Sequence, residues 1–189
     1  MKKYQNYTSK KSNTKIYGFI PVRLKASRFP GKPLKKILNK TMLEHVFERA
    51  KIYKKWEKLL VTTCDKTIIS FSKKKNYPNI LTSKTHKRAL DRVYEAAKKL
   101  KVKKNDIVVC VQGDEPLLYP VMIKKVVDPL FKKNINSTVL AMEIISKKQF
   151  YDKNIVKIVN NSLGEVLYTS RSPIPFQSGN NIKNAKRIH

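Results

Sequence analysis

Four basic side chains fall in one short loop directly after the first apolar run of the chain. The stretch FIPVRLKASRFPGKPL covers residues 19–34, and its cations are Arg23, Lys25, Arg28 and Lys32. Cationic side chains pair well with phosphate oxygens, and a glycine such as Gly31 lets a bound group approach the backbone closely. The loop is therefore a candidate phosphate site.

Two common phosphate-binding motifs do not describe this loop. The Walker A pattern fails because Ala26 stands at its first glycine position and Pro33 follows Gly31-Lys32, while the GxGxxG fingerprint is absent. An ordinary solvated loop in a basic chain is an equally good interpretation of the loop alone.

A pair of carboxylates follows the most apolar run of the chain. In VVCVQGDEPLL, residues 108–118, Asp114 and Glu115 come directly after the run, with Gly113 making the exit turn and Pro116 stiffening it. Carboxylates opposite a cationic loop suit a Mg²⁺ ion that binds a triphosphate. Asp114 as the cap of a turn is the alternative. Acids are scarce here, 13 against 42 Lys and Arg, which adds weight to a pair at this position.

The elements that must position these loops alternate between strands and helices. Apolar runs predict strands at 16–21, 59–63, 106–112 and 138–144, and a hairpin of 155–159 and 165–170 around NNSLG. We expect 106–112 to be a central parallel strand covered on both faces, because it is almost continuously apolar. Periodicity, the capping box of Thr41 and Glu44, and Pro120 as a first helical residue predict helices at 41–55, 88–100 and 120–133.

This alternation predicts an α/β fold with a mainly parallel central sheet and helices on both of its faces. In such sheets ligands bind beyond the carboxyl ends of the strands. The cationic loop and the carboxylate pair both follow strands, so we expect them at the same edge of the sheet.

The strong positive charge is mostly background. The formal net charge is +29, yet the cations are spread from residue 2 to residue 187 and are mostly Lys. Arg is the residue favoured for gripping phosphates and bases, and nucleic-acid platforms interleave aromatic rings with it, which this sequence does not. Codon bias towards adenine and thymine explains the composition, and nucleic acid is an unfavoured partner.

The sequence contains few features that indicate a cellular compartment. Cys64 and Cys110 form no CxxC or disulfide framework, which fits a reduced, cytoplasmic location. No run reaches the ~20 apolar residues of a membrane span, and the polar N-terminus lacks a signal-peptide core. We expect residues 1–14 to be a disordered basic tail and 15–189 to be one domain.

Four motifs carry a resemblance to a known family. FIPVRLKASRFPGKPL resembles the IPARxxSxRxPGKPL signature of sugar cytidylyltransferases, closest to the 3-deoxy-manno-octulosonate cytidylyltransferases (CMP-KDO synthetases). VQGDEP, 111–116, is identical to the second motif of that family. DKNIVKIV, 152–159, is similar to DPNxVKVV, and LYTSRSPIPF, 167–176, resembles LYFSRxxIPW. The resemblance implies the Rossmann-like fold of nucleotide-diphospho-sugar transferases.

The resemblance also implies a reaction and its partners. CMP passes from CTP to the anomeric hydroxyl of a 3-deoxy sugar acid, KDO or a close relative, and pyrophosphate is released, for lipopolysaccharide or other surface glycans. Carried over by motif position, the triphosphate contacts are Arg23, Ser27, Arg28 and Lys32. Asp114 binds Mg²⁺ and acts with Lys32 in catalysis. The expected sugar-acid contacts are Gln112, Arg171, Asn154, His86, Asp91 and Arg92, with the Arg171 guanidinium suited to a carboxylate.

Three positions depart from the family pattern. Ala26 replaces a Ser whose hydroxyl Ser27 can supply. HKRALDR, 86–92, aligns with HxSGTDR but has Arg88, Ala89 and Leu90 in place of small residues, which leaves open a sialic-acid-like or amino-substituted nonulosonic acid as substrate. Cys64 stands where the family has an Asp, next to Asp65.

Family members continue for roughly another sixty residues, with a second magnesium carboxylate, more of the sugar pocket and dimer contacts. We therefore expect 15–189 to be a truncated domain that binds CTP weakly and turns over little, and a homodimer at full length. An inactive fragment and a basic nucleic-acid-binding protein are the remaining alternatives.

Overall fold

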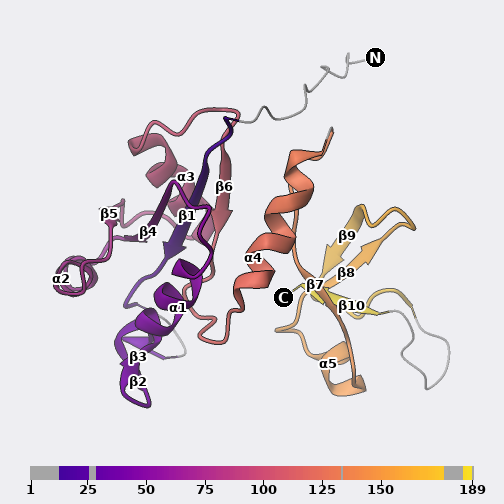
Figure 1. Cartoon of the computed structure of the whole chain (residues 1–189). Helices are drawn as coiled ribbons and strands as arrows, with labels where there is room; N and C mark the ends of the chain where they lie inside the picture. Colours follow the sequence, from indigo (N-terminus) through magenta and orange to yellow (C-terminus); the bar gives the residue numbers. More distant parts are fainter. Residues whose placement is uncertain (1–12, 26–28, 133, 177–184, 189) are drawn as a thin grey trace. The chain divides into compact units, whose positions relative to one another are not determined.

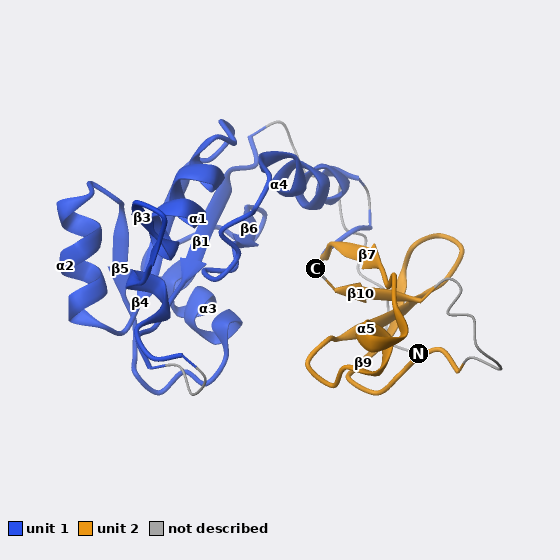
Figure 2. Cartoon of the chain, turned by 90° about the horizontal axis from the view of Figure 1, so that it is seen from below, with its two compact units in different colours: residues 1–136 blue, residues 137–189 orange. Residues whose placement is uncertain are grey.

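The structure is a computed structural model that describes residues 13–25, 29–132, 134–176 and 185–188. Internal contacts divide the chain into two compact units, residues 1–136 and residues 137–189, which Figure 2 shows in different colours. Most of the predicted basic tail, and Ser27 and Arg28 of the cationic loop, lie outside the described residues.

Unit 1 is built on a parallel sheet of four strands (Figure 1). The strands are β1 (Ile16–Pro21), β4 (Lys58–Thr63), β5 (Asn79–Leu81) and β6 (Ile107–Cys110), in the order β5-β4-β1-β6. Every pairing among them is parallel. The predicted strands at 16–21 and 59–63 are confirmed, and so is the mainly parallel sheet.

Apolar side chains leave both faces of this sheet, as the period of two along each strand requires. One face packs into a core cluster with buried residues of α1 (Met42–Lys51), α2 (Lys66–Lys74) and α4 (Pro120–Val127). On the other face, Phe19 and Leu60 pack against Val93 and Ala96 of α3 (Ala89–Lys99). The prediction of helices on both faces is confirmed.

The prediction of a central position for the strand at 106–112 is wrong for the described part of the chain. β6 stands at the end of the strand order, with β1 as its neighbour there. Ile107 and Val109 are buried in the larger core cluster, whereas on the other face Val108 is 40% exposed and Cys110 is partly buried against the smaller cluster. The continuous apolar run therefore has one buried face and one face that is covered only in part.

Helix α1 begins where the capping box predicted. The Thr41 hydroxyl accepts a hydrogen bond from the Glu44 backbone N–H (3.2 Å), and the Glu44 carboxylate accepts one from the Thr41 N–H (2.7 Å). Burial disfavours the charged form of Glu44, but the Lys75 ammonium and the Thr41 hydrogen bonds outweigh it and lower its pKa to about 2. The helix ends at Lys51, short of the predicted residue 55.

Helix α4 begins at Pro120 as expected and ends at Val127, and a 3-10 turn η2 (Asp128–Phe131) follows it. Pro129 lacks the backbone N–H that a continuing α-helix needs. Among the described residues, no helix is both long enough and apolar enough to cross a membrane.

Unit 2 contains an antiparallel sheet with the strand order β7-β10-β8-β9. Its strands are β7 (Ala141–Glu143), β8 (Lys157–Asn160), β9 (Val166–Ser170) and β10 (Lys186–Ile188), and its helix is α5 (Lys147–Tyr151). The predicted hairpin is confirmed, since β8 and β9 pair around the NNSLG turn. β7 is shorter than the predicted strand at 138–144.

The capping box gives a first prediction. Thr41→Ala removes the hydroxyl that accepts the Glu44 N–H, so we expect the free energy of unfolding to fall by about 1 kcal/mol. Urea denaturation followed by circular dichroism measures this loss. Thr67→Ala, at an exposed position of α2, is the control and should lose nothing. An equal loss in both variants would contradict a specific capping role for Thr41.

Candidate functional site

The loop after β1 is closed at its base by hydrogen bonds of one residue, Leu24. The Leu24 N–H donates to Asp65 Oδ2 (2.8 Å), and the Gly31 N–H donates to the Leu24 carbonyl (2.9 Å). Gly31 has a φ of 72°, in the left-handed region that glycine adopts easily, and it opens the short 3-10 helix η1 (Lys32–Leu34). Arg23 and Lys32 therefore stand at the two ends of a closed loop.

Asp65 was noticed in the sequence only as a remnant of a motif, and its role here was missed. It follows β4, whose carboxyl end lies at the same edge of the sheet as that of β1. An acid directly after a neighbouring parallel strand was the available signal. The 41-residue separation of the hydrogen-bonded partners hid which peptide it would hold.

The carboxylate motif meets the cationic loop at this edge. Lys32 Nζ lies 3.0 Å from Asp114 Oδ2, in an ion pair whose side chains are 33% and 59% exposed. Gly113 makes the approach possible, because a Cβ built on it would lie 2.3 Å from Val22 Cγ1 and 2.7 Å from the Pro21 carbonyl oxygen. The loops after β1 and β6 are in direct contact.

The Lys32–Asp114 pair can be exchanged for a ligand at little cost. Exposed ion pairs contribute about 0–1 kcal/mol, so a phosphate can replace Asp114 beside Lys32, and a cation can replace Lys32 beside Asp114. In the described ranges no three His, Cys, Asp or Glu residues gather around one point. Mg²⁺ is commonly held by one or two carboxylates together with ligand phosphates and water, so Asp114 alone fits such an ion.

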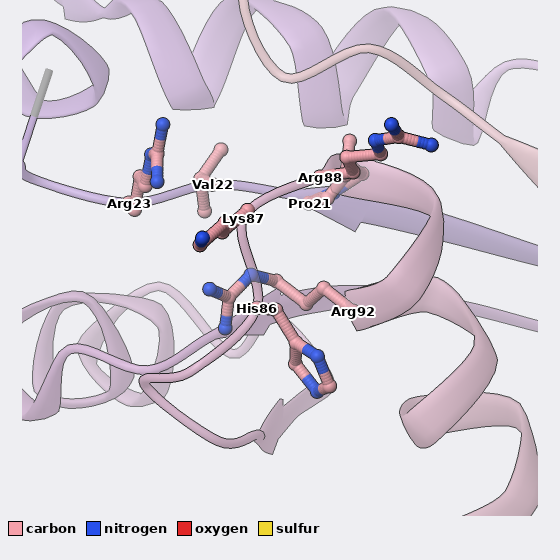
Figure 3. Close-up of a pocket in the computed structure, with 8 residues that line it drawn as sticks. Pro21, Val22, Arg23, His86, Lys87, Arg88 and Arg92 are labelled. Atoms are coloured by element: carbon pink, nitrogen blue, oxygen red, sulfur yellow. The ribbon is translucent and has the colours of Figure 1, made fainter.

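A cavity of about 140 Å³ opens beside the end of β1 in the same unit. Figure 3 shows its lining, which comes from the end of β1 and the two residues after it, and from the segment that leads into α3 and the start of that helix. The lining residues are Pro21, Val22, Arg23, His86, Lys87, Arg88, Ala89 and Arg92. Arg23, His86 and Arg92, three predicted ligand contacts, thus share one cavity.

Glu95 fixes the segment that forms one wall of this cavity. Its carboxylate accepts the Ser83 N–H (2.8 Å), pairs with His86 Nε2, and lies 2.7 Å from Lys99 Nζ. The Lys99 ammonium above all, and then the Ser83 N–H, lower the pKa of Glu95 from an ordinary 4.5 to about 2. The segment 83–86 is therefore held to α3 by an ionised side chain.

The two other predicted sugar-acid contacts of unit 1 lie outside the cavity lining. Asp91 is exposed in the first turn of α3, and Gln112 is exposed just after β6. The backbone carbonyl of Gln112 accepts a hydrogen bond from the Glu115 N–H (3.4 Å). This bond closes the turn that contains Asp114.

In unit 2, the predicted residues Asn154 and Arg171 lie together. Arg171 Nη1 donates to the carbonyl oxygens of Lys153 (3.0 Å) and Asn154 (3.1 Å). The buried Lys157 ammonium ties the same two segments, because it donates to the carbonyls of Asp152 (2.6 Å), Ile155 (3.0 Å) and Arg171 (2.9 Å). Burial lowers the pKa of Lys157. Its inward position was missed, since IVKIV reads as a strand with an outward Lys.

Comparison with known proteins matches the cytidylyltransferase family model to residues 17–187. The chain belongs to the cytidylyltransferase family. A 3-deoxy-manno-octulosonate cytidylyltransferase of Haemophilus influenzae (strain PittEE) is 36% identical over 89% of this chain and 67% of its own length. The protein of the same name from Thermodesulfovibrio yellowstonii is 39% identical over 87% of this chain and 66% of its own length.

A solved structure has the same fold. CMP:2-keto-3-deoxy-manno-octonic acid synthetase, complexed with CTP, superposes with a TM-score of 0.82 and 29% identity over 93% of this chain and 72% of that chain. The predicted resemblance to sugar cytidylyltransferases is confirmed at the level of family and fold. The chain spans 61–67% of the length of its Haemophilus influenzae relatives.

The contact at Gly113 gives a second prediction. In Gly113→Ala the new methyl group overlaps Val22 and the Pro21 carbonyl, so the loop after β6 must move away from β1. We expect a loss of about 1–3 kcal/mol in the free energy of unfolding, the usual cost of overpacking. Denaturant titration measures it. Val22→Ala added to Gly113→Ala should cost less than the sum of the two single changes, and strict additivity would contradict the overlap.

The depressed pKa of Glu95 gives a third prediction. A carboxyl whose pKa is lowered on folding stabilises the protein fully above pH 4.5, and this contribution disappears as the pH falls towards 2. Glu95→Gln should therefore lower the free energy of unfolding by about 1–3 kcal/mol at pH 7, as expected for hydrogen bonds to a charged group. Thermal unfolding from pH 7 to pH 2 should show the two proteins converging below pH 4.5. A difference that stays constant would contradict a role for the charge.

Proposed function

We propose that this chain binds CTP and transfers CMP to the anomeric hydroxyl of a 3-deoxy sugar acid of the KDO type, releasing pyrophosphate. The single observation that carries the proposal is the 3.0 Å contact between Lys32 Nζ and Asp114 Oδ2. It brings a cation that can bind phosphate next to a carboxylate that can bind a metal ion. The choice of CTP and of the sugar acid is supported by the names of the relatives and by the CTP complex of the similar structure.

The reaction needs positioning and charge neutralisation more than covalent chemistry by the protein. The sugar hydroxyl oxygen forms a bond to the α-phosphorus, the bond to the bridging oxygen breaks, and pyrophosphate leaves with that electron pair while the hydroxyl proton is released. Both reactants are anions, so cations must offset their repulsion and the charge of the transition state.

Each residue of the proposed site has a distinct task. Lys32 would exchange its contact with Asp114 for a phosphate oxygen, and Arg23 would neutralise the triphosphate from the other end of the closed loop. Asp114 would hold Mg²⁺, an ion that offsets phosphate charge when it is bound. Gly113 keeps these groups together by allowing the two loops to touch.

The sugar-acid contacts stay proposals. His86 and Arg92 are the candidates in unit 1, and Asn154 and Arg171 are the candidates in unit 2, where backbone hydrogen bonds fix the direction of the Arg171 guanidinium. The homodimer and the cytoplasmic location inferred from the sequence also stay predictions.

A binding measurement tests the nucleotide part of this proposal. Lys32→Ala should weaken CTP binding roughly 10–100-fold, because a charge-assisted hydrogen bond contributes about 1.5–3 kcal/mol. Asp114→Ala should abolish the gain in CTP affinity on addition of Mg²⁺. Lys25→Ala, an exposed cation of the same loop, is the matched control and should change affinity less than about twofold, as expected for a screened surface charge. Isothermal titration calorimetry measures all of these affinities.

Equal weakening by Lys25→Ala and Lys32→Ala would indicate general charge attraction and contradict a built site. The transfer itself is tested by pyrophosphate release from CTP and Mg²⁺ with a panel of sugar acids. Release that requires a 3-deoxy sugar acid, at the low rate expected above for this chain, is the expected result. A preference for sialic-acid-like acceptors would contradict the KDO assignment, and salt-dependent binding of arbitrary DNA without pyrophosphate release would favour the nucleic-acid alternative.

A further inference from the structure

The guanidinium of Arg92 is almost entirely removed from water, yet its partners are neutral. The residue is 3% exposed, and Nη1 donates to the Thr82 hydroxyl and to the Ser83 carbonyl (3.2 Å), while Nη2 lies 3.6 Å from Cys64 Sγ. A buried charge without a counter-ion costs several kcal/mol, even when its hydrogen bonds are satisfied. The position therefore calls for a negative charge.

The carboxylates around Arg92 are committed elsewhere. Asp65 is connected to it only through the sulfur of Cys64, with 3.9 Å from Sγ to Oδ2, and its Oδ2 accepts the Leu24 N–H. Glu95 is taken by Ser83, His86 and Lys99. Within the described ranges, no carboxylate forms an ion pair with Arg92.

The other charged residues that line the cavity increase the need for an anion. Arg23, Lys87 and Arg88 are cationic, whereas His86 is already paired with the Glu95 carboxylate. Figure 3 shows the charged end of Arg88 directed away from that of Arg92, whereas Arg23 and Lys87 turn their charged ends to the other side of the view, where the Arg92 guanidinium lies. Among the described residues, the lining therefore contains basic side chains and no carboxylate.

The shape of the cavity also suits an anion. Its wall includes Ala89, the first residue of the 11-residue helix α3, whose N-cap residue Arg88 makes no side-chain capping hydrogen bond and whose first turn also holds the exposed Asp91. The N–H groups of the first turn of a helix bind anions readily. The volume of about 140 Å³ is several times the ~10–15 Å³ that one water molecule needs, and it leaves room for a phosphate or a carboxylate group.

We propose that this cavity is a binding site for one oxyanion group, a phosphate or a carboxylate, which supplies the missing counter-charge to Arg92. Arg92 binds it from the buried side, and Arg23, Lys87 and the first turn of α3 bind it from the walls. Inorganic phosphate and the anionic group of a substrate share this chemistry. The site does not depend on the transfer reaction, because inorganic phosphate alone is expected to occupy it.

Cys64 makes the proposal testable without touching Arg92. Cys64→Asp places a carboxylate next to Nη2 and gives Arg92 an internal partner. Cys64→Ser keeps a small neutral group there and excludes a thiolate, the one other source of negative charge at this position. The two variants differ by little more than the charge at one site.

The experiment measures the melting temperature of the full chain against increasing inorganic phosphate, with NaCl adjusted to constant ionic strength. We expect a saturable rise in the wild type and in Cys64→Ser, equal to an ~11-fold shift of the unfolding equilibrium at a phosphate concentration ten times Kd. Cys64→Asp should start at a higher melting temperature and respond several-fold less. Lys104→Gln, a remote exposed cation, is the control for general screening and should respond like the wild type.

Amide shifts of residues 88–92 in NMR spectra, titrated with phosphate, locate the binding. Displacement by CTP identifies a nucleotide phosphate as the natural occupant, displacement by a 3-deoxy sugar acid identifies its carboxylate, and displacement by neither identifies an independent anion site. The proposal is overturned by a response in Cys64→Asp equal to that of the wild type, or by no response beyond that to NaCl. A response in Cys64→Ser but not in the wild type would also overturn it, since a thiolate would then already neutralise Arg92.

Discussion

The whole site depends on how closely the ends of two neighbouring parallel strands approach each other. β1 and β6 pair directly, Phe19 faces Cys110 in their register, and the Val111 N–H extends the ladder to the Phe19 carbonyl at 2.8 Å. Just beyond, the chain has no space for a Cβ at residue 113. Because glycine occupies that position, Asp114 reaches Lys32, and two loops that lie 82 residues apart become one surface.

Scarce acids hold this surface in place. In a chain with 13 acids and 42 Lys and Arg, Asp65 fixes the Leu24 peptide, Asp114 contacts Lys32, and Glu95 fixes Ser83. Asp65 holds the base of the loop after β1, Asp114 links that loop to the loop after β6, and Glu95 holds the segment before α3. These carboxylates thus position the segments that carry Arg23 and Lys87 while Arg92 itself has no acidic partner among the described residues. The net charge alone, spread over the sequence, predicts no such arrangement.

Local signals were sufficient to predict what is local. The strand Ile16–Pro21 and the start of α1 follow from apolar runs and from the Thr41–Glu44 spacing, because neighbouring residues determine them. The edge position of β6 and the inward direction of Lys157 depend on which segments pack beside them. The hydrophobic periodicity of a segment does not indicate its neighbours. The cavity likewise requires 21–23 to meet 86–92 through tertiary packing. The sequence thus predicted that the cationic loop and the carboxylate pair share one edge of the sheet, whereas the cavity between 21–23 and 86–92 was found only in the fold.

Exposure separates the two kinds of cation in this site. Lys32 is partly exposed and paired with an exposed carboxylate, so water screens the pair and compensates for its opening, and the side chain can follow a ligand. Arg92 is held on three neutral atoms inside the protein, where any movement would break hydrogen bonds that water cannot replace. Its charge is therefore present before a ligand arrives and costs no reorganisation on binding. In the proposed sites, Lys32 would adapt to an anion by exchanging partners, whereas Arg92 would bind an anion from a preorganised position.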